Sequence, residues 1–376
     1  MTIQKKEEKN DRITSLDGLR GLCTFAVAFL FHFQMFGVEV PFRGLIKTLY
    51  ETGWLAVDIF FVISGFAISL TYENKIAKDN ISFYSFIIKR VKHLYPIMHV
   101  TLFVCTLEHL LYFIKMGKAY WFSYFDIPHF ILNFLGIQSG WFEATLSFNG
   151  PAWCISVEML LYILFYFIVK VTRKNKVVLY CVESIGILLG LIILKKNLLL
   201  PFLNQFIARG VIGFFGGMII KDIWLKYEKR ELQERYVKWS VRLSAIAIFV
   251  WFLLCYFVGT ESWIWGQEGI LFVFVISISP MSVWLALTGR LSTRILNLRV
   301  LRALGNISLE IYMWHFPVMV FIVLLDVYNI WDVLNGRSLF IVYVCSVLLV
   351  SIIYKFVTTK IESLYCRREI HVYEND

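Results

Sequence analysis

The sequence predicts an all-α protein that crosses a membrane about ten times, and two observations support this. Of the 376 residues, 59% are hydrophobic, and the mean hydropathy is +0.68, so a single soluble core could not bury the apolar surface. Apolar windows of roughly 18 to 22 residues recur along the chain, and a helix of that length spans the roughly 30 Å hydrocarbon layer. We therefore expect a multi-pass protein of the cell membrane, a bacterial inner membrane or a plasma membrane.

The expected spans follow one another along most of the chain. Ten windows are long enough to cross: 21–37, 54–72, 93–114, 151–169, 177–194, 203–220, 243–258, 269–289, 304–325 and 338–354. A shorter apolar piece, 127–138, is expected to be re-entrant or interfacial. Residues 1–20 and 355–376 are expected to be tails on one membrane domain, 21–354. Since no small-residue cleavage site follows the first apolar run, we expect the first span to act as an anchor.

The distribution of basic residues predicts which ends face the cytoplasm. With a cytoplasmic N-terminus, the inner segments hold 29 of the 37 Lys and Arg residues and the outer segments hold 7, with Arg209 inside a span. This asymmetry predicts that both termini are cytoplasmic. It also accounts for the net charge of +10 without nucleic acid as a partner. The seven cysteines have neither paired nor metal-type spacing, so they indicate no metal site.

The outer segments are rich in aromatic residues. They contain YWFSYF at 120–125, GWF at 140–142 and SWIW at 262–265. One interpretation is an interfacial aromatic belt, which anchors helices at the level of the lipid headgroups. The other is a platform on which sugar rings stack, because the flat apolar faces of the rings suit both roles.

Ionisable residues within the apolar windows are the first candidates for function. Such a side chain near the bilayer centre costs about 2.5 to 3.5 kcal/mol, so it usually faces a cavity, a partner or a substrate. Glu158 is an example, because it lies near the middle of the apolar run PAWCISVEMLLYILFYFIV at 151–169. The others are His32, Asp58, His99, Glu108, His109, Glu183, Arg209, Glu310 and His315.

Six segments have a recognisable local pattern and occur in a fixed order. They are ITSLDGLRGLCTFAVAFLFHF (13–33), WLAVDIFFVISGFAIS (54–69), FIIKRVKHLYP (86–96), PAWCISVEMLLY (151–162), RGVIGFFGGM (209–218) and LGNISLEIYMWHFPV (304–318). Together they resemble the acyltransferase 3 family of integral-membrane acyltransferases, which acylate cell-surface or secreted glycans and some small molecules. The resemblance covers nearly the whole chain, from about residue 13 to 354.

The resemblance implies an acyl-CoA donor, such as acetyl-CoA, on the cytoplasmic side and an acceptor hydroxyl reached from the other side. It assigns Arg20 and His32 to the Arg/His pair of the first helix, Arg90 to the basic residue before the third span, and Glu158 to the acidic residue of its motif. Arg20, Lys89, Arg90 and Arg209 are the expected donor-binding residues, although basic residues at the inner ends of spans also serve as topological anchors. In FFGGM, we expect Gly216 and Gly217 to allow close helix approach.

Two positions depart from the family pattern. The family usually has ten residues between the Arg and the His of the first helix, whereas eleven separate Arg20 from His32. In a regular helix the longer step ends about 120° round from the starting face. Either the helix is wound differently there, or Arg20 reaches in from a non-helical segment. His93 stands where the family commonly has a second Arg, which affects the expected donor-phosphate contact.

Depth along the helices predicts where the catalytic groups meet. His32 lies about 18 Å along its helix from Arg20, Glu158 enters from the outer end by about 12 Å, and His315 enters from the inner side by about 16 Å. We expect these three residues to meet near mid-membrane, with His32 as the base for the acceptor hydroxyl. Glu158 would then orient His32 or relay its proton; the alternative is a structural pair with Arg209 or His315.

The predicted function is transfer of an acyl group, acetyl in the first instance, from cytoplasmic acyl-CoA to a hydroxyl of a glycan or glycolipid. Succinyl or a longer acyl group, or a small-molecule acceptor, are alternatives. We expect no attached extracytoplasmic domain, so the membrane core would handle the acceptor or pass the acyl group to a partner. A proton-coupled secondary transporter is the rival class, since intramembrane Glu, His and Arg also form proton relays. The sequence does not indicate an oligomeric state.

Overall fold

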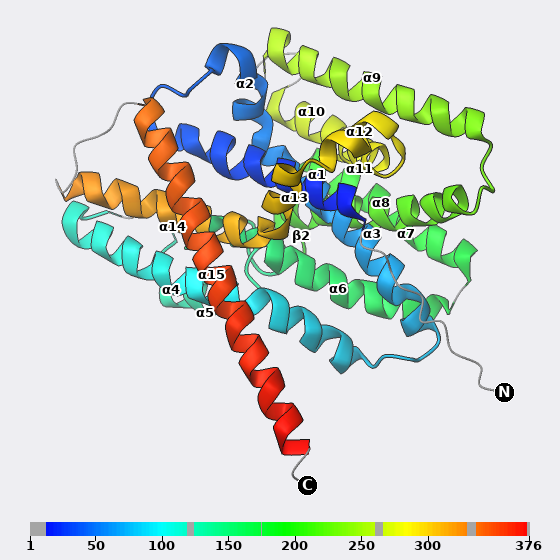
Figure 1. Cartoon of the computed structure of the whole chain (residues 1–376), viewed down its shortest axis with the longest axis horizontal. Helices are drawn as coiled ribbons and strands as arrows, with labels where there is room; N and C mark the ends of the chain where they lie inside the picture. The colour runs from blue at the N-terminus through cyan, green and yellow to red at the C-terminus, as the bar shows by residue number, and fades with distance from the viewer. Residues whose placement is uncertain (1–12, 119–123, 174, 260–265, 329–335, 374–376) are drawn as a thin grey trace.

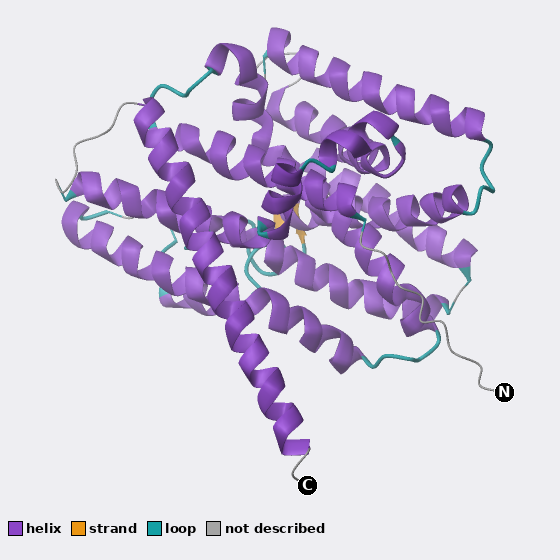
Figure 2. Ribbon diagram, in the orientation of Figure 1, coloured by secondary structure: helices purple, strands orange, loops and turns teal. Residues whose placement is uncertain are grey.

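The computed structural model describes residues 13–118, 124–173, 175–259, 266–328 and 336–373. Within these ranges the protein is helical apart from one pair of two-residue strands, so the expected all-α fold is confirmed (Figure 2). Most long helices run roughly parallel across the view of Figure 1, and α15 (Gly336–Tyr373), in red, crosses them at a steep angle. The aromatic segment SWIW lies outside the described residues, as does most of YWFSYF.

The helices follow one another in chain order, with two-residue strands before α8. The remaining α-helices are α1 (Thr14–Thr24), α2 (Arg43–Thr52), α3 (Ala56–Ala77), α4 (Phe83–Met116), α5 (Ile127–Leu135), α6 (Trp153–Thr172), α7 (Lys176–Lys196), α8 (Gln205–Glu228), α9 (Glu234–Val258), α10 (Gly266–Val273), α11 (Ser279–Thr288), α12 (Arg290–Leu296), α13 (Arg299–Asn306) and α14 (Ser308–Val327). The antiparallel strands are β1 (Leu199–Leu200) and β2 (Leu203–Asn204).

Nine helical segments of the described chain are long and apolar enough to span a membrane. They coincide with nine of the ten expected spans. The tenth, 203–220, corresponds to α8, which at 24 residues is about 36 Å long and buries Arg209 and Lys221 in the interior of the protein. With α8 counted as a crossing, the described chain would have the ten spans that the sequence predicts, and the cytoplasmic position of both termini stays a prediction.

The first span is not a uniform helix. After α1 the chain forms a π-helix, η1 (Phe25–Phe31), and then a 3-10 helix, η2 (His32–Phe36). A π turn accommodates one more residue than an α turn, so it absorbs the extra residue between Arg20 and His32. Of the two explanations for the unusual spacing, local rewinding is therefore correct, because Arg20 lies within α1.

Helices α3 and α8 pack closely because glycines line their contact. A Cβ at Gly217 would overlap the carbonyl oxygen of Val62, and one at Gly65 would overlap that of Phe214. Only a residue without a Cβ lets the two backbones approach this closely. The expectation for Gly217 is confirmed. For Gly216 it is wrong, since a Cβ there would meet open space.

The short apolar piece at 127–138 forms α5, which is far too short to cross a bilayer. Asp126 caps α5 by accepting a hydrogen bond from the backbone N–H of His129 at 2.9 Å. The Tyr95 hydroxyl of α4 donates to the carbonyl of Leu135, which fixes α5 against that helix. The loop that follows α5 carries Leu146 into the site described below.

Candidate active site

The first part of the site is a cavity of about 230 Å³ that contains His32, here called the histidine cavity. The Nδ1 atom of His32 lies 2.9 Å from the carbonyl oxygen of Val27. Because a carbonyl oxygen only accepts, Nδ1 carries the proton and donates it to Val27. The neutral ring then keeps its lone pair on Nε2, which is the atom that a general base uses.

The π turn brings about this hydrogen bond. In η1 the backbone N–H of His32 also donates to the carbonyl of Val27, five residues earlier. The backbone and side chain of His32 therefore share one acceptor. The irregular winding thus restores the helix face and also fixes the tautomer of the ring.

His315 of α14 lies directly beside His32. The two ring centroids are 4.4 Å apart, and the rings are tilted by 60°. Nδ1 of His315 donates to the carbonyl of Tyr312 at 2.6 Å, so this ring also has its lone pair on Nε2. That Nε2 is buried and has no hydrogen-bond partner among the residues that the structure describes. A buried polar atom without a partner is costly and often marks a functional site.

Arg209 of α8 also lines the histidine cavity. Its Nε and Nη2 donate to the two carboxylate oxygens of Asp58 at 2.8 and 2.9 Å. The guanidinium carbon lies 4.9 Å from the ring centroid of Trp54 and 4.8 Å from that of Trp153. The ion pair and the two ring faces together compensate the burial of this charge.

The loop after α5 contributes Leu146 to this cavity, and its Glu143 joins a charge cluster with the first turn of α5. His129 contacts Asp126 through Nδ1 at 2.6 Å and Glu143 through Nε2 at 3.2 Å. Hydrogen bonds from His129, first from its backbone N–H and then from its ring, lower the pKa of Asp126. Burial raises the pKa of Glu143.

The second part of the site is a cavity of about 220 Å³ that contains Glu158, here called the glutamate cavity. One oxygen of Glu158 accepts hydrogen bonds from the Ser64 hydroxyl and from the Tyr162 hydroxyl, each at 2.5 Å. Glu158 therefore points toward α3 and its own helix. The expected meeting of three residues is only partly realised, since His32 and His315 meet and Glu158 lies in this neighbouring cavity.

Three positively charged or basic residues share the glutamate cavity with Glu158: Arg20, Arg90 and His93. Nη2 of Arg90 donates to the Tyr72 hydroxyl at 2.7 Å, and its guanidinium lies over the Tyr72 ring. Lys89 lies apart from this group, in a separate pocket at the connection between α3 and α4. The structure therefore brings Arg20 and Arg90 together, but it does not bring Lys89 or Arg209 to them.

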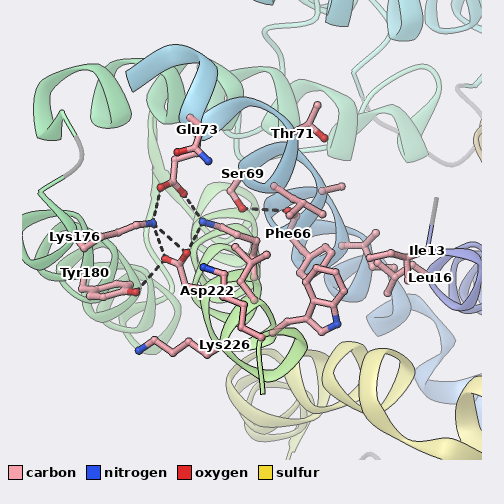
Figure 3. A pocket seen from close by; sticks show the side chains of 18 of the residues that line it. Ile13, Leu16, Phe66, Ser69, Thr71, Glu73, Lys176, Tyr180, Asp222 and Lys226 are labelled. Carbon is pink, nitrogen blue, oxygen red and sulfur yellow. Dashed lines mark hydrogen bonds and ion pairs between the residues drawn. The ribbon is translucent and has the colours of Figure 1, made fainter. Parts of the chain in front are cut away.

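The third part is a much larger cavity of about 1090 Å³, here called the large cavity (Figure 3). Its lining includes Arg20, Lys226 and Lys229, which can attract an anion. It also includes the aromatic side chains of Phe66 and Trp224, whose ring centroids are 5.5 Å apart. The volume is in the range that holds a ligand of nucleotide size.

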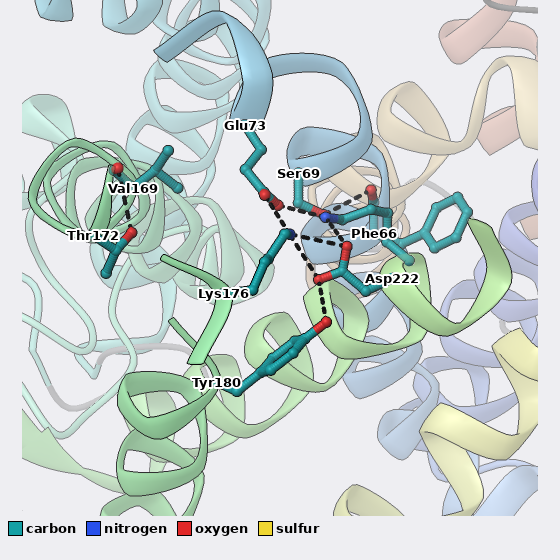
Figure 4. A network of polar contacts seen from close by, with 9 residues as sticks. Phe66, Ser69, Glu73, Val169, Thr172, Lys176, Tyr180 and Asp222 are labelled. Atoms are coloured by element: carbon teal, nitrogen blue, oxygen red, sulfur yellow. Dashed lines mark hydrogen bonds and ion pairs between the residues drawn. The ribbon is translucent and has the colours of Figure 1, made fainter. Parts of the chain in front are cut away.

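Two lysines and two carboxylates form a network at the edge of the large cavity (Figure 4). Lys176 donates to Glu73 at 2.5 Å and to Asp222 at 2.9 Å, while Lys221 donates to Glu73 and, at 2.7 Å, to Asp222. The Tyr180 hydroxyl donates to Asp222 at 3.1 Å. This lysine–carboxylate network joins α3, α7 and α8, and its charges balance within the cluster.

The three cavities form a series. Arg20, Ile63 and Ala67 line both the large cavity and the glutamate cavity. Among the described residues, Tyr312 lines both the glutamate cavity and the histidine cavity, and no other residue does. A narrow ligand could therefore extend from the large cavity past Arg20 and Glu158 and end at Tyr312, with His32 on the other side.

Comparison with known proteins agrees with this arrangement. The family profile named "Acyltransferase domain" matches residues 13–356, which is nearly the whole chain. The chain belongs to the acyltransferase 3 family. As the sequence predicts, the chain combines an acyltransferase domain with several candidate membrane spans.

Relatives of this acyltransferase occur in Staphylococcus aureus. The chain is 25% identical over 342 residues to "Putative O-acetyltransferase SACOL0978" of strain COL, with 84% of this chain and 52% of the relative covered. It is 23% identical over 388 residues to "O-acetyltransferase OatA" of strain NCTC 8325 / PS 47, with 95% of this chain and 59% of the relative covered. The chain thus spans little more than half the length of these relatives. No solved structure matches it significantly.

Several residues of this acyltransferase site were outside the candidates taken from sequence. Tyr312, Tyr162 and Trp54 lie within the recognised segments, but each is an ordinary aromatic residue of an apolar helix or its end, without a distinctive signal. Lys176 and Lys221 fall among the basic residues that topology already explains. Only their three-dimensional partners distinguish these residues from core and anchor positions.

Proposed function

We propose that this protein transfers an acetyl group from acetyl-CoA on the cytoplasmic side to a hydroxyl of a glycan or glycolipid on the other side. The series of three cavities supports the proposal, because it joins a nucleotide-sized space with basic residues to a histidine whose Nε2 is available as a base. The nucleotide of CoA would occupy the large cavity. The acylated arm would pass Arg20 into the glutamate cavity, while the phosphates stay near the surface because burying them unpaired is costly.

Each polar residue then has a role in the transfer. Nε2 of His32 takes the proton of the acceptor hydroxyl, the new C–O bond forms at the thioester carbon, and the C–S bond breaks as CoA leaves. His315 positions the ring of His32 by direct contact. Glu158 offsets the positive charge of Arg20 and Arg90 along the path of the donor. It also relays a proton to the sulfur of the departing CoA, which leaves as the thiol.

Arg209 has a role in the histidine cavity. Its pair with Asp58 uses Nε and Nη2, which leaves the two N–H groups of Nη1 outside that pair. A guanidinium fixed beside the reacting carbonyl would stabilise the negative charge that develops on its oxygen. We therefore assign Arg209 to the transition state and Arg20 and Arg90 to the donor.

The test uses sealed vesicles of known orientation that contain the purified protein. Labelled acetyl-CoA is supplied on the cytoplasmic face, and a membrane-impermeant oligosaccharide is supplied on the other face. We expect label on the oligosaccharide, and mass spectrometry of the product identifies the hydroxyl. Transfer only when both substrates share one compartment would contradict the crossing of the acyl group. Absence of acetyl-CoA binding to the protein would contradict the donor and favour the transporter.

A further inference from the structure

The wall between the glutamate cavity and the histidine cavity is one aromatic side chain. Tyr312 of α14 is 5% exposed and faces both cavities. On one side its ring packs edge-to-face on Phe60, with centroids 6.0 Å apart. On the other side its ring centroid lies 5.6 Å from that of His315. A donor arm in the glutamate cavity therefore meets the phenol ring before it reaches the histidines.

Cys154 lies next to the wall and lines the glutamate cavity together with Tyr312. The Cys154 thiol donates to the carbonyl of Pro151 at 3.5 Å. Pro151 lines the histidine cavity, so this bond joins the two sides of the wall beside the Tyr312 ring.

From this geometry we propose that Tyr312 is a specificity-determining residue, a partition that limits the size of the acyl group and keeps water from the thioester until transfer. The proposal rests on the proposed function and extends it to acyl selection. In the closed position seen here, the phenol ring separates the donor arm from His32. Transfer requires the ring to turn aside, and the gap so opened admits a short acyl chain more readily than a long one.

The closed partition has a chemical consequence. Without it, water in the histidine cavity could attack the thioester carbonyl, with His32 as the base. A C–O bond would form, the C–S bond would break, and the products would be a carboxylic acid and free CoA thiol. Excluding water from a reactive group until the correct acceptor is present is a general function of closed active sites.

The first experiment compares acyl-chain preference in purified wild type, Tyr312→Ala and Phe316→Ala. Transfer to the acceptor is measured with acetyl-CoA and butyryl-CoA. Removing the Tyr312 ring should reduce the preference for acetyl by about tenfold, since one or two methylenes discriminate by that order. Phe316 lines only the histidine cavity, so Phe316→Ala removes a ring of similar size without opening the wall and should keep the preference.

The second experiment measures release of CoA thiol from acetyl-CoA without acceptor. Tyr312→Ala should raise this hydrolysis several-fold relative to transfer. Tyr312→Phe removes the hydroxyl but keeps the ring, so its hydrolysis should stay near that of wild type.

These results separate the proposal from the function on which it rests. Unchanged chain preference and unchanged hydrolysis in folded Tyr312→Ala would overturn the partition, while wild-type transfer would still support the acyltransferase. If Tyr312→Ala does not fold, Tyr312→Leu decides the question. Hydrolysis in Tyr312→Phe raised as far as in the variant without the ring would likewise reject the ring as the barrier.

Discussion

The histidine cavity and the lysine–carboxylate network are both polar regions among membrane-spanning helices, but they satisfy their polar groups differently. In the network, both lysines contact both carboxylates, and three helices are joined. Beside the histidine cavity, Nε2 of His315 has no partner within the described chain, and the Nδ1 bonds of His32 and His315 go to backbone carbonyls. Paired charges hold helices together, whereas available lone pairs offer chemistry.

The two regions also differ in backbone geometry, which is regular in the network and irregular at the histidine cavity. The network is built on the regular helices α3, α7 and α8. The histidine cavity depends on a π-helix that passes directly into a 3-10 helix at His32. Departures from α-helical geometry cost stability and are retained where function needs them. We therefore propose that the irregular region, the histidine cavity, serves catalysis and that the regular region, the lysine–carboxylate network, stabilises the fold.

The largest expected effect is the loss of the base. His32→Ala should lower the rate of acyl transfer by about 100- to 10,000-fold, because general base catalysis contributes on that scale. Membrane insertion and acetyl-CoA affinity should be unchanged, since the donor site that we propose lies in the other two cavities. Single-turnover transfer and calorimetry of donor binding measure the two quantities. Activity within a few-fold of wild type would remove His32 from the mechanism.

A change in the length of the π turn should give a second large effect, and a deletion should act differently from an insertion. Deleting Ala28 converts the spacing to ten residues between Arg20 and His32, so an α turn can replace the π turn and keep both residues on one face. Inserting one Ala after Val27 rotates His32 by about a further 100°. We expect the insertion to abolish transfer and the deletion to retain much more of it. Equal loss in both variants would contradict the role of the π turn.

A moderate effect is expected at the donor end. Arg90→Lys should weaken acetyl-CoA binding by about tenfold, because an ammonium cannot reproduce the planar fork of the guanidinium. The matched control is Lys89→Arg, since Lys89 is the neighbouring residue but lies in a separate pocket. Calorimetry should show normal affinity for the control. Unchanged affinity in Arg90→Lys would reject a contact between Arg90 and the donor.

The network should respond in stability and not in turnover. Lys221 is 3% exposed, and Lys221→Met leaves two carboxylates with one lysine between them. Breaking a buried pair in this way costs about 3 kcal/mol or more. We expect a lower Tm, with transfer per folded molecule near that of wild type. A normal Tm together with a much lower transfer rate would show that the network takes part in transfer, and it would contradict the distinction between the two regions.

The smallest effect concerns the loop beside the histidine cavity. The pKa of Asp126 is lowered in the folded protein, so its contribution to stability is present above the unfolded pKa and is lost as the pH falls through the folded value. Acid should therefore loosen the α5 loop locally. Hydrogen exchange of residues 127–135 measures this, and Asp126→Asn should flatten the pH dependence. If Asp126→Asn keeps the pH dependence of hydrogen exchange, that dependence arises from Glu143 and not from Asp126.

The sequence predicts the architecture well for a clear physical reason. Hydrocarbon thickness fixes the length of an apolar span, and the positive-inside rule fixes its direction, so both can be counted along the chain. The one expected span that is not among the long apolar helices is α8, which carries Arg209, Lys221 and Asp222. The charges of Arg209 and Lys221 are tolerated inside the bundle, where Asp58 and Glu73 neutralise them.

The sequence by itself therefore determined the membrane class, the span positions, the family and most of the polar residues of the site. The tertiary structure decided the partners: Arg209 lies with His32 instead of the donor-end arginines, Glu158 is separated from His32, and Tyr312 stands between them. Local patterns record the composition and face of each helix. They do not record rotation and depth relative to other helices, which depend on packing such as the contact at Gly217 and on one π turn.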